Sequence, residues 1–467
     1  MQESASLAAP QPCPICSKPT SADQFGFVEC VCGWGGPGDP VESVRGASRA
    51  FTLLDRRLAG SMARRELARI ARKKSVASSG DLLYLALLTV MSTVIYLVIG
   101  ALFVGSIIWF VQLLMGRAWI GAVLAGVIVL YLYWALFGMP QRIRGIVAPI
   151  SDYPRLAAVL AEVAQRVGVK TPRWVILFPS ANFSLNRRML WGRSLFPQMV
   201  VGVGAASLAQ MNDLEIRAIL AYLLAHYRHE HTLLARFFRG AETAMYHIID
   251  GLVAGISTNF AFRGVKEGTL TGSPSIFRLR NEYYTARSNT NIAMMAAVFV
   301  LWIVLAPLRL LWFVFHLMRL RQSRASEYES DAAAIETYGP QSFINGLTAA
   351  LATAATMRGS ILDIRDEMVK RNDPNFFAEL RRHYAELPAN YLGEIRKRAT
   401  LDYRSLERSH PITPDRIRAA ILLGIPDPVV AQTPQSAAHL LTPAGAADAS
   451  GVERQLTDIL FASAKRR

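Results

Sequence analysis

The chain has 467 residues, a formal net charge of +16 and a mean hydropathy of +0.25, and 52% of its residues are hydrophobic. Charged residues make up only 18% of the sequence, whereas soluble domains contain about 25%. This composition argues against a purely soluble globular protein. It favours a membrane protein with room for two or three domains.

The four cysteines lie near the N-terminus in two short pairs, Cys13-Pro-Ile-Cys16 and Cys30-Val-Cys32. Two such pairs are typical of a small zinc ribbon, in which each pair forms a tight turn and four thiolates close a tetrahedral site. A segment this short has no core of its own, so the metal would supply its folding free energy. We predict a zinc-ribbon-like module over residues 1–40 with a structural zinc. Two disulfides, or free thiols in an unstructured tail, are the alternatives.

A strongly basic stretch follows. Residues 45–74 contain ten lysines and arginines against Asp55 and Glu66, which accounts for half of the net charge. Apolar residues recur among them near helical spacing, so a basic amphipathic helix is expected within residues 41–80. Because this stretch precedes a long apolar run, we interpret it as the cytoplasmic flank of a membrane segment, in contact with the lipid bilayer. Nucleic acid is the less favoured partner. A reducing cytoplasm also disfavours disulfides among the cysteines.

Two apolar runs without a charged residue come next, Leu82–Met115 and Ala118–Gln141. Each exceeds the roughly 20 residues that a spanning helix requires. Only Gly116 and Arg117 separate them, which predicts a transmembrane helical hairpin over residues 81–141. Basic residues flank the outer ends of both runs, so both ends are expected in the cytoplasm.

Two later apolar segments leave the number of spans open between two and four. Residues 292–318 form a long run that Pro307 and Arg309 interrupt, and arginines follow it. Residues 241–262 are a weaker candidate that contains Glu242. The loop between the two segments is rich in arginine, which is unfavourable for export. Both segments could instead lie at the interface or inside a helical bundle, where charged groups pair.

The middle of the chain has the pattern of mixed α and β structure. Residues 174–178 and 199–203 have the composition of short strands between proline-containing loops. Asn212 or Asp213 is a suitable cap for a helix that is expected to run to about Arg239.

Five motifs in this region follow one another in a recognisable order. They are Ser180-Ala-Asn-Phe183, Val201-Gly-Val-Gly204, Glu215-Ile-Arg-Ala-Ile-Leu-Ala221, Ser323-Arg-x-x-Glu327-x-x-x-Asp331, and Ser409-His-Pro411 with Arg416. Between about residues 80 and 425 the chain resembles the HtpX-like family of membrane zinc metallopeptidases, which are related to the CAAX prenyl proteases. The resemblance implies a mainly α membrane protein with an α+β gluzincin-like peptidase domain at residues 150–425. It also implies a bacterial-type inner membrane location, with the N-terminus and the peptidase-like domain in the cytoplasm.

The resemblance assigns roles to particular residues. The zinc site of such peptidases needs H-E-x-x-H on one helix, where the two His bind zinc and the Glu is the general base. A Glu from a later helix is the third ligand and corresponds to Glu327, with Asp331 as its supporting partner. His410 corresponds to a residue near the substrate cleft and is a possible catalytic group.

The H-E-x-x-H frame falls on Tyr222-Leu-Leu-Ala-His226. Tyr222 therefore replaces the first ligand, and Leu223 replaces the base. Leucine cannot take a proton from water, and a phenol with a pKa of about 10 is a poor zinc ligand at neutral pH. The two catalytic positions are degenerate in this register.

His226 and Glu327 remain as a vestigial zinc pair, so a second, catalytic-type zinc is disfavoured. Without metal, a charge-assisted hydrogen bond between them is expected to tie the two helices together. Glu327 and Asp331, which are one turn apart, are expected to form a stabilising polar cluster with the nearby Arg324.

A shifted ligand set, drawn from His226, Glu230 or His229 together with Glu327, is the alternative. It moves the site by one helical turn, about 5.4 Å, from the place where Glu327 would point. Residues 229–231 are therefore expected to form a solvated polar helix end.

We expect a membrane-anchored metallopeptidase-like protein with an incomplete zinc site, that is, a pseudopeptidase that binds or regulates an unknown protein partner or peptide. The alternative is an active zinc metalloendopeptidase that acts on membrane or misfolded proteins with the shifted ligands. Residues 426–467 are expected to form an Ala/Pro-rich linker and a short C-terminal helix.

Overall fold

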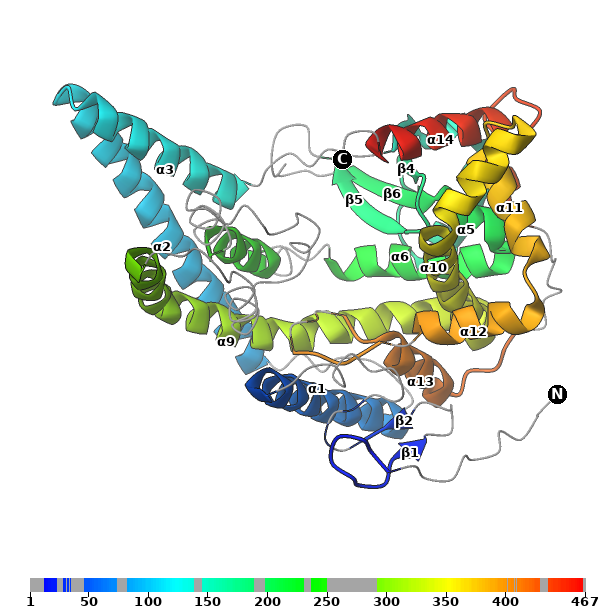
Figure 1. Cartoon of the computed structure of the whole chain (residues 1–467), viewed down its shortest axis with the longest axis horizontal. Coiled ribbons are helices and arrows are strands. Elements are labelled where there is room, and N and C mark those ends of the chain that lie inside the picture. The colour runs from blue at the N-terminus through cyan, green and yellow to red at the C-terminus, as the bar shows by residue number, and fades with distance from the viewer. Residues whose placement is uncertain are drawn as a thin grey trace.

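The computed structural model describes residues 12–22, 28–30, 32, 34, 46–73, 82–137, 145–188, 198–230, 237–249, 292–400, 402–406, 408, 410–428 and 436–464. Most of these residues are helical, and a small mixed sheet packs against one group of helices (Figure 1). The expectation of a mainly helical chain with a small α+β part is confirmed.

The N-terminal part begins with a short hairpin. β1 (Ser21–Ala22) pairs antiparallel with β2 (Val28–Glu29). This pairing lies between the two cysteine pairs along the chain and brings them side by side. Residues 1–11, 23–27, 31, 33 and 35–40 of the predicted zinc-ribbon-like module lie outside the described residues.

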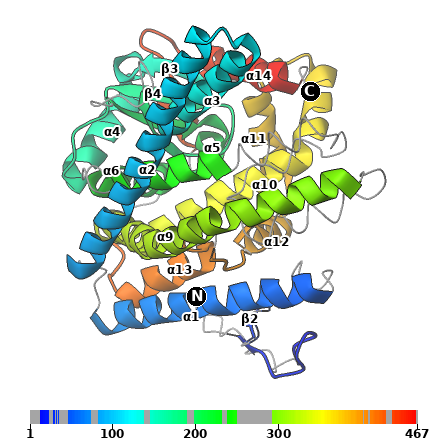
Figure 2. The same ribbon diagram turned by 90° about the vertical axis from the view of Figure 1, so that its left-hand side faces the viewer.

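α1 (Gly46–Lys73) is the basic helix that the charge pattern predicts. It is rich in Ala, Leu and Arg, which are strong helix formers. One face is buried, with Ala59 and Ile70 almost fully covered, and packs against α13 (Thr413–Leu423) (Figure 2). The opposite face is exposed and carries arginines such as Arg64. The helix is therefore part of the folded body on one side only.

The apolar runs form two antiparallel helices, α2 (Leu82–Met115) and α3 (Trp119–Phe137). The turn between them is tight, and Arg117 adopts a positive φ of 56° in it. A Cβ at Gly126 would lie only 3.2 Å from the Phe110 ring, so this glycine allows the helices to approach closely.

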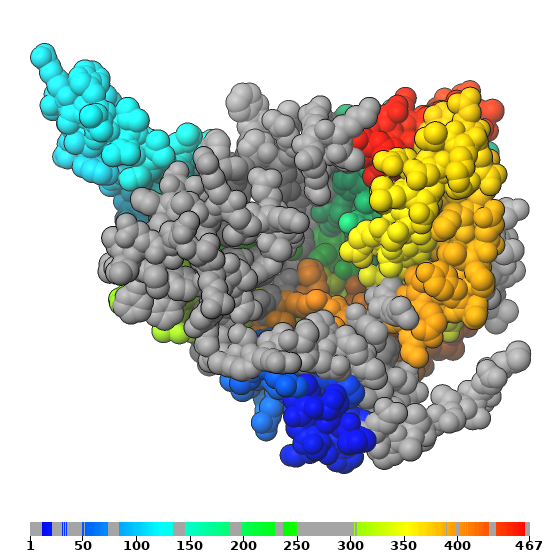
Figure 3. Space-filling model, viewed as in Figure 1, coloured from blue at the N-terminus to red at the C-terminus, as the bar shows by residue number. Residues whose placement is uncertain are grey.

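Among the residues that the structure describes, one helix is long and apolar enough to cross a membrane, and it comprises Tyr84–Met115. A shorter apolar helix, Trp119–Tyr133, lies beside it. Apolar side chains on both helices are exposed, with Leu97 at 67% and Ile120 at 83%. The hairpin projects from the body (Figure 3), so this apolar surface is suited to lipid.

The sheet has the strand order β3-β4-β6-β5. β4 and β6 are parallel, and the other pairs are antiparallel. In this order β3 and β5 form the two edges of the sheet. β4 and β6 confirm the two predicted strands, and the Ser180–Phe183 motif lies just before β5. Helix α4 (Pro154–Val167) packs its apolar side chains into the core beneath the sheet. The strands are β3 (Ile146–Pro149), β4 (Trp174–Phe178), β5 (Ser184–Arg188) and β6 (Gln198–Gly204).

Helix α6 (Asp213–Glu230) carries the Tyr222–His226 segment. It begins with a reciprocal capping box, in which the Glu215 amide donates to the Asn212 side chain and the Asn212 amide donates to the Glu215 carboxylate, both at 2.9 Å. The helix was expected to reach Arg239, but residues 231–236 lie outside the described residues.

α9 (Ile292–Tyr338) is a single helix of 47 residues that passes through Pro307. The helix therefore continues past both residues that interrupt the apolar run, Pro307 and Arg309. A proline inside a helix costs about 3 kcal/mol, which the packing of α9 against α2, α6 and the helix of residues 237–249 offsets. Residues 250–262 of the weaker apolar segment lie outside the described residues.

The remaining helices surround α6 and α9. In the C-terminal helix, Glu453 is buried and accepts hydrogen bonds from Asn375 and Arg381, which fix this helix on the domain. Residues 429–435 of the predicted linker lie outside the described residues. The other elements are η2 (Ile150–Asp152), α5 (Ala205–Gln210), α10 (Pro340–Arg371), α11 (Phe376–Glu386), α12 (Ala389–Thr400), η3 (Ala437–Leu441) and α14 (Ser450–Ala464).

Candidate functional site

Helices α6 and α9 place the first frame position against the predicted third ligand. The Tyr222 hydroxyl donates a hydrogen bond of 2.7 Å to Glu327 Oε2. Glu327 is completely buried and Tyr222 is half-buried. The Tyr222 hydroxyl is therefore hydrogen-bonded to the carboxylate that corresponds to the third zinc ligand.

The second carboxylate oxygen of Glu327 is also engaged. His410 Nδ1 lies 2.5 Å from Glu327 Oε1, and His226 Nε2 lies 3.5 Å from the same atom. The expected pairing of His226 with Glu327 is thus the longer contact, and His410 is the close partner. The structure brings together four residues that the sequence motifs predicted at or near the site: Tyr222, His226, Glu327 and His410.

Asp331 has a different partner from the predicted one. Arg416 Nε and Nη2 donate to its two carboxylate oxygens at 2.9 and 2.5 Å. The Arg416 guanidinium also lies 4.4 Å above the centre of the Tyr222 ring. Arg324, which was expected to join Asp331, donates instead to backbone carbonyl oxygens of the segment before His410. The predicted Arg324 cluster is therefore wrong in its pairing.

The electrostatics of the site favour an ionised Glu327. Burial acts to raise its pKa, but the His410 hydrogen bond and the charges of His410, His226 and Arg416 outweigh it and hold the pKa below its usual range. Burial raises the pKa of Asp331 to about 6, although the Arg416 pair opposes this effect. Burial also raises the pKa of Tyr222 well above its usual value, so its phenol is a proton donor at neutral pH.

The second frame position offers no chemistry. Leu223 is 6% exposed and packs in the main core, so no base replaces the missing Glu there. Ser330 Oγ lies 3.4 Å from His226 Nδ1, which superficially resembles a nucleophile beside a base. However, Ser330 is completely buried and donates to the Ser326 carbonyl at 2.8 Å, so its hydroxyl is inaccessible to a substrate.

The site lies in a part of the chain that matches a known family. The model of peptidase family M48 matches residues 151–421. The chain belongs to peptidase family M48. Among solved structures, the crystal structure of S. mikatae Ste24p is similar, with 17% sequence identity and a TM-score of 0.30, over 81% of this chain and 76% of that one. No curated protein matches the chain.

Membership of family M48 implies zinc, and the described residues at the predicted zinc position are Tyr222, His226, Glu327 and His410. Both Glu327 oxygens already contact protein donors, Tyr222 on one side and His410 on the other. Among the described residues, the site residues do not place three ligand atoms within 4.8 Å of one another. The side chains of His229 and Glu230, which belong to the shifted ligand set, lie outside the described residues, as does His231.

The four cysteines do form such a group. Their Sγ atoms all lie within 4.8 Å of one another. Cys13 and Cys32 are 3.7 Å apart, and Cys16 and Cys30 are 3.4 Å apart. In a tetrahedral zinc site with Zn–S bonds of about 2.3 Å, the sulfurs lie roughly 3.8 Å apart. The four thiols are therefore placed where they can bind one metal ion.

Backbone geometry around the first cysteine pair supports this arrangement. The Ile15 amide donates to Cys13 Sγ at 3.4 Å, and the Ser17 amide donates to the Cys13 carbonyl at 2.9 Å. A hydrogen bond from the Lys18 backbone lowers the pKa of Cys16 to about 7, whereas burial raises the pKa of Cys30 and Cys32.

The sequence motifs did not predict the role of Tyr222 or the Asp331–Arg416 pair. Arg416 was noted only as part of a late motif. A buried arginine needs a carboxylate partner. That requirement predicts an Asp or Glu beside Arg416 if this arginine is buried. Which carboxylate it would meet depends on packing between segments 85 residues apart.

Proposed function

We propose that this M48 chain is a membrane-anchored pseudopeptidase, which keeps the peptidase scaffold to bind a peptide or a protein partner without hydrolysing it. The observation that supports this proposal most directly is the hydrogen bond between Tyr222 and Glu327. Tyr222 stands at the position of the first zinc ligand, and its hydroxyl already has a protein partner. Leu223 removes the general base at the same time, so metal binding and water activation are both impaired.

The sheet edge supports a binding role. β5 pairs with β6 on one side only, and within the described strands its other edge has no neighbour. An extended peptide can add to such an edge through backbone hydrogen bonds. The His410 side chain is 59% exposed and is available for contact with a partner.

The four cysteines are proposed to bind a structural zinc. Cys13 and Cys30 are buried together with Trp34, and this cluster is too small to fold without metal. The zinc would be closed by four thiolates, with no open position for substrate. It would stabilise the N-terminal module and take no part in hydrolysis.

The proposed topology places both ends of the α2–α3 hairpin in the cytoplasm of a bacterial-type inner membrane, with the peptidase-like domain on the same side. The basic α1 and the basic flank after α3 support this orientation. The bilayer is then one partner, and an unidentified peptide or protein is the other.

The test restores the missing groups. Tyr222→His with Leu223→Glu rebuilds H-E-x-x-H, in a chain whose four cysteines are replaced by serine. We expect this variant to gain zinc and chelator-sensitive casein cleavage, while its parent has neither. Tyr222→His alone is the control, because it adds a ligand without the base. Chelator-sensitive casein cleavage by the parent would instead establish the active-peptidase alternative.

A further inference from the structure

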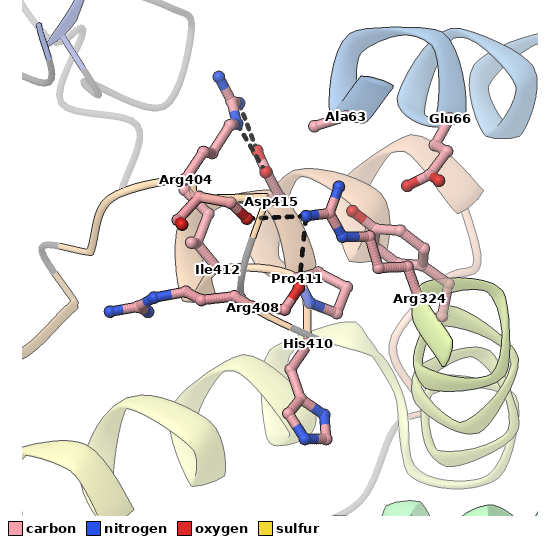
Figure 4. Close-up of a pocket in the computed structure, with 11 residues that line it drawn as sticks. Ala63, Glu66, Arg324, Arg404, Arg408, His410, Pro411, Ile412 and Asp415 are labelled. Carbon is pink, nitrogen blue, oxygen red and sulfur yellow. Dashed lines mark hydrogen bonds and ion pairs between the residues drawn. The ribbon is translucent and has the colours of Figure 1, made fainter. Parts of the chain in front are cut away.

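The segment of residues 402–411, of which 402–406, 408, 410 and 411 are described, places His410 beside the buried Glu327, and Arg324 of α9 contacts it from one side. Arg324 is 4% exposed, and its Nη2 donates to the carbonyl oxygens of Ser405 at 3.0 Å and Arg408 at 3.4 Å. Figure 4 shows these contacts, with the His410 ring pointing away from the arginines. The position of His410 therefore depends on how this segment is held.

α1 holds the outer side of the same segment. Asp55 Oδ1 accepts a hydrogen bond of 2.9 Å from the Leu406 amide. The Arg56 guanidinium lies 4.5 Å above the centre of the Tyr403 ring. Two adjacent residues of α1 thus contact two nearby residues of the segment, one through a charge-assisted hydrogen bond and the other through a cation–π contact.

The same part of α1 touches the cysteine cluster. Leu53, two residues before Asp55, packs against the core formed by Cys13, Cys30 and Trp34. Leu54, its neighbour, points outward and is 49% exposed. One turn of α1 therefore contacts the cysteine module on one side and the His410 segment on the other.

The contact that α1 makes at Glu66, three turns after Asp55, is weaker. Glu66 on α1 points toward Arg324 on α9 (Figure 4), yet Glu66 Oε2 and Arg324 Nε are buried without a hydrogen-bond partner. Buried polar atoms that lack partners weaken an interface. The hydrogen bond of Asp55 and the cation–π contact of Arg56 with the segment thus lie at the end of α1 near the cysteines.

We infer that the four-cysteine module and α1 act as a metal-dependent strap on the peptidase-like domain. Binding of Zn²⁺ by the four thiolates folds the module, the folded module fixes the Leu53 end of α1, and α1 holds the His410 segment against Glu327. Loss of zinc releases this end of α1 and loosens the exposed His410 wall of the peptide site. This inference rests on the structural zinc of the proposed function.

Amide hydrogen exchange of the full-length chain in lipid nanodiscs tests the strap, read on peptides that cover residues 402–411. We expect about tenfold faster exchange there after zinc is removed by replacing all four cysteines with serine, since the packing of one leucine is lost. Leu53→Ala and Asp55→Ala should give the same change with the cysteines intact. Leu54→Ala is the matched control and should change nothing.

Zinc content, measured on the same samples, separates the possible failures. Zinc that is lost with unchanged exchange at residues 402–411 overturns the strap and leaves the structural zinc standing. A wild-type chain without zinc overturns both. Exchange at β4 reports on the whole domain. If the cysteine variant unfolds there, the Leu53→Ala and Asp55→Ala variants decide, and unchanged exchange in both overturns the strap.

Discussion

The buried pair of Asp331 and Arg416 offers the strongest test of how the site is held together. Their side chains are 2% and 11% exposed, and two hydrogen bonds of 2.5 and 2.9 Å join them. Removing one partner of a buried, hydrogen-bonded ion pair costs about 3–5 kcal/mol, because the other charge stays buried without compensation. We therefore expect Arg416→Ala to lower the free energy of unfolding by about 3–5 kcal/mol.

The assay is denaturant unfolding in detergent, followed by tryptophan fluorescence at neutral pH. Lys370→Ala is the matched control, because the Lys370–Glu367 pair is exposed and its loss should be undetectable. Combining Arg416→Ala with Asp331→Asn should cost less than the sum of the single changes, since no uncompensated charge remains. An Arg416→Ala variant as stable as the Lys370→Ala variant would refute this account of the pair.

Three further predictions concern nearby groups. Tyr222→Phe removes a hydrogen bond to an ionised carboxylate and should cost about 1–3 kcal/mol in the same assay, whereas Tyr391→Phe at an exposed position should cost nothing. Burial raises the pKa of Glu66 to about 7, above its unfolded value of about 4.3, so the native state binds more protons and stability falls as pH rises between these values. Glu66→Gln should flatten that fall and stabilise the chain by about 3 kcal/mol at pH values above the pKa of Glu66, and an unchanged pH profile would contradict the burial of this group. Asn212→Ala breaks the capping box and should cost about 1 kcal/mol, measured against an exposed substitution on the same helix.

The local elements could be predicted because their signals are local. The strand at residues 174–178 is a short apolar run after a proline, and the helix that begins at Asp213 follows a capping residue. Uncharged runs of the length of α2 have few alternatives to a spanning helix. The spacing of the four cysteines likewise predicted a group that can bind a metal.

The site could be predicted only in part. The motif register places Glu327 opposite the degenerate frame, but it does not show that His410, not His226, is the close partner. The same holds for Arg416, whose partner lies 85 residues earlier. Such pairings depend on side-chain packing between distant segments, which no local pattern encodes. Similarly, the proline in α9 indicates a break locally, while the packing of the bundle keeps the helix continuous.

The most direct test of the central claim is the zinc content of the full-length chain with all four cysteines replaced by serine. The pseudopeptidase account predicts no bound zinc in this variant, and one zinc per chain in the wild type. One zinc per chain retained without the cysteines would contradict it, because the metal would then have to bind at the M48 site beside Glu327.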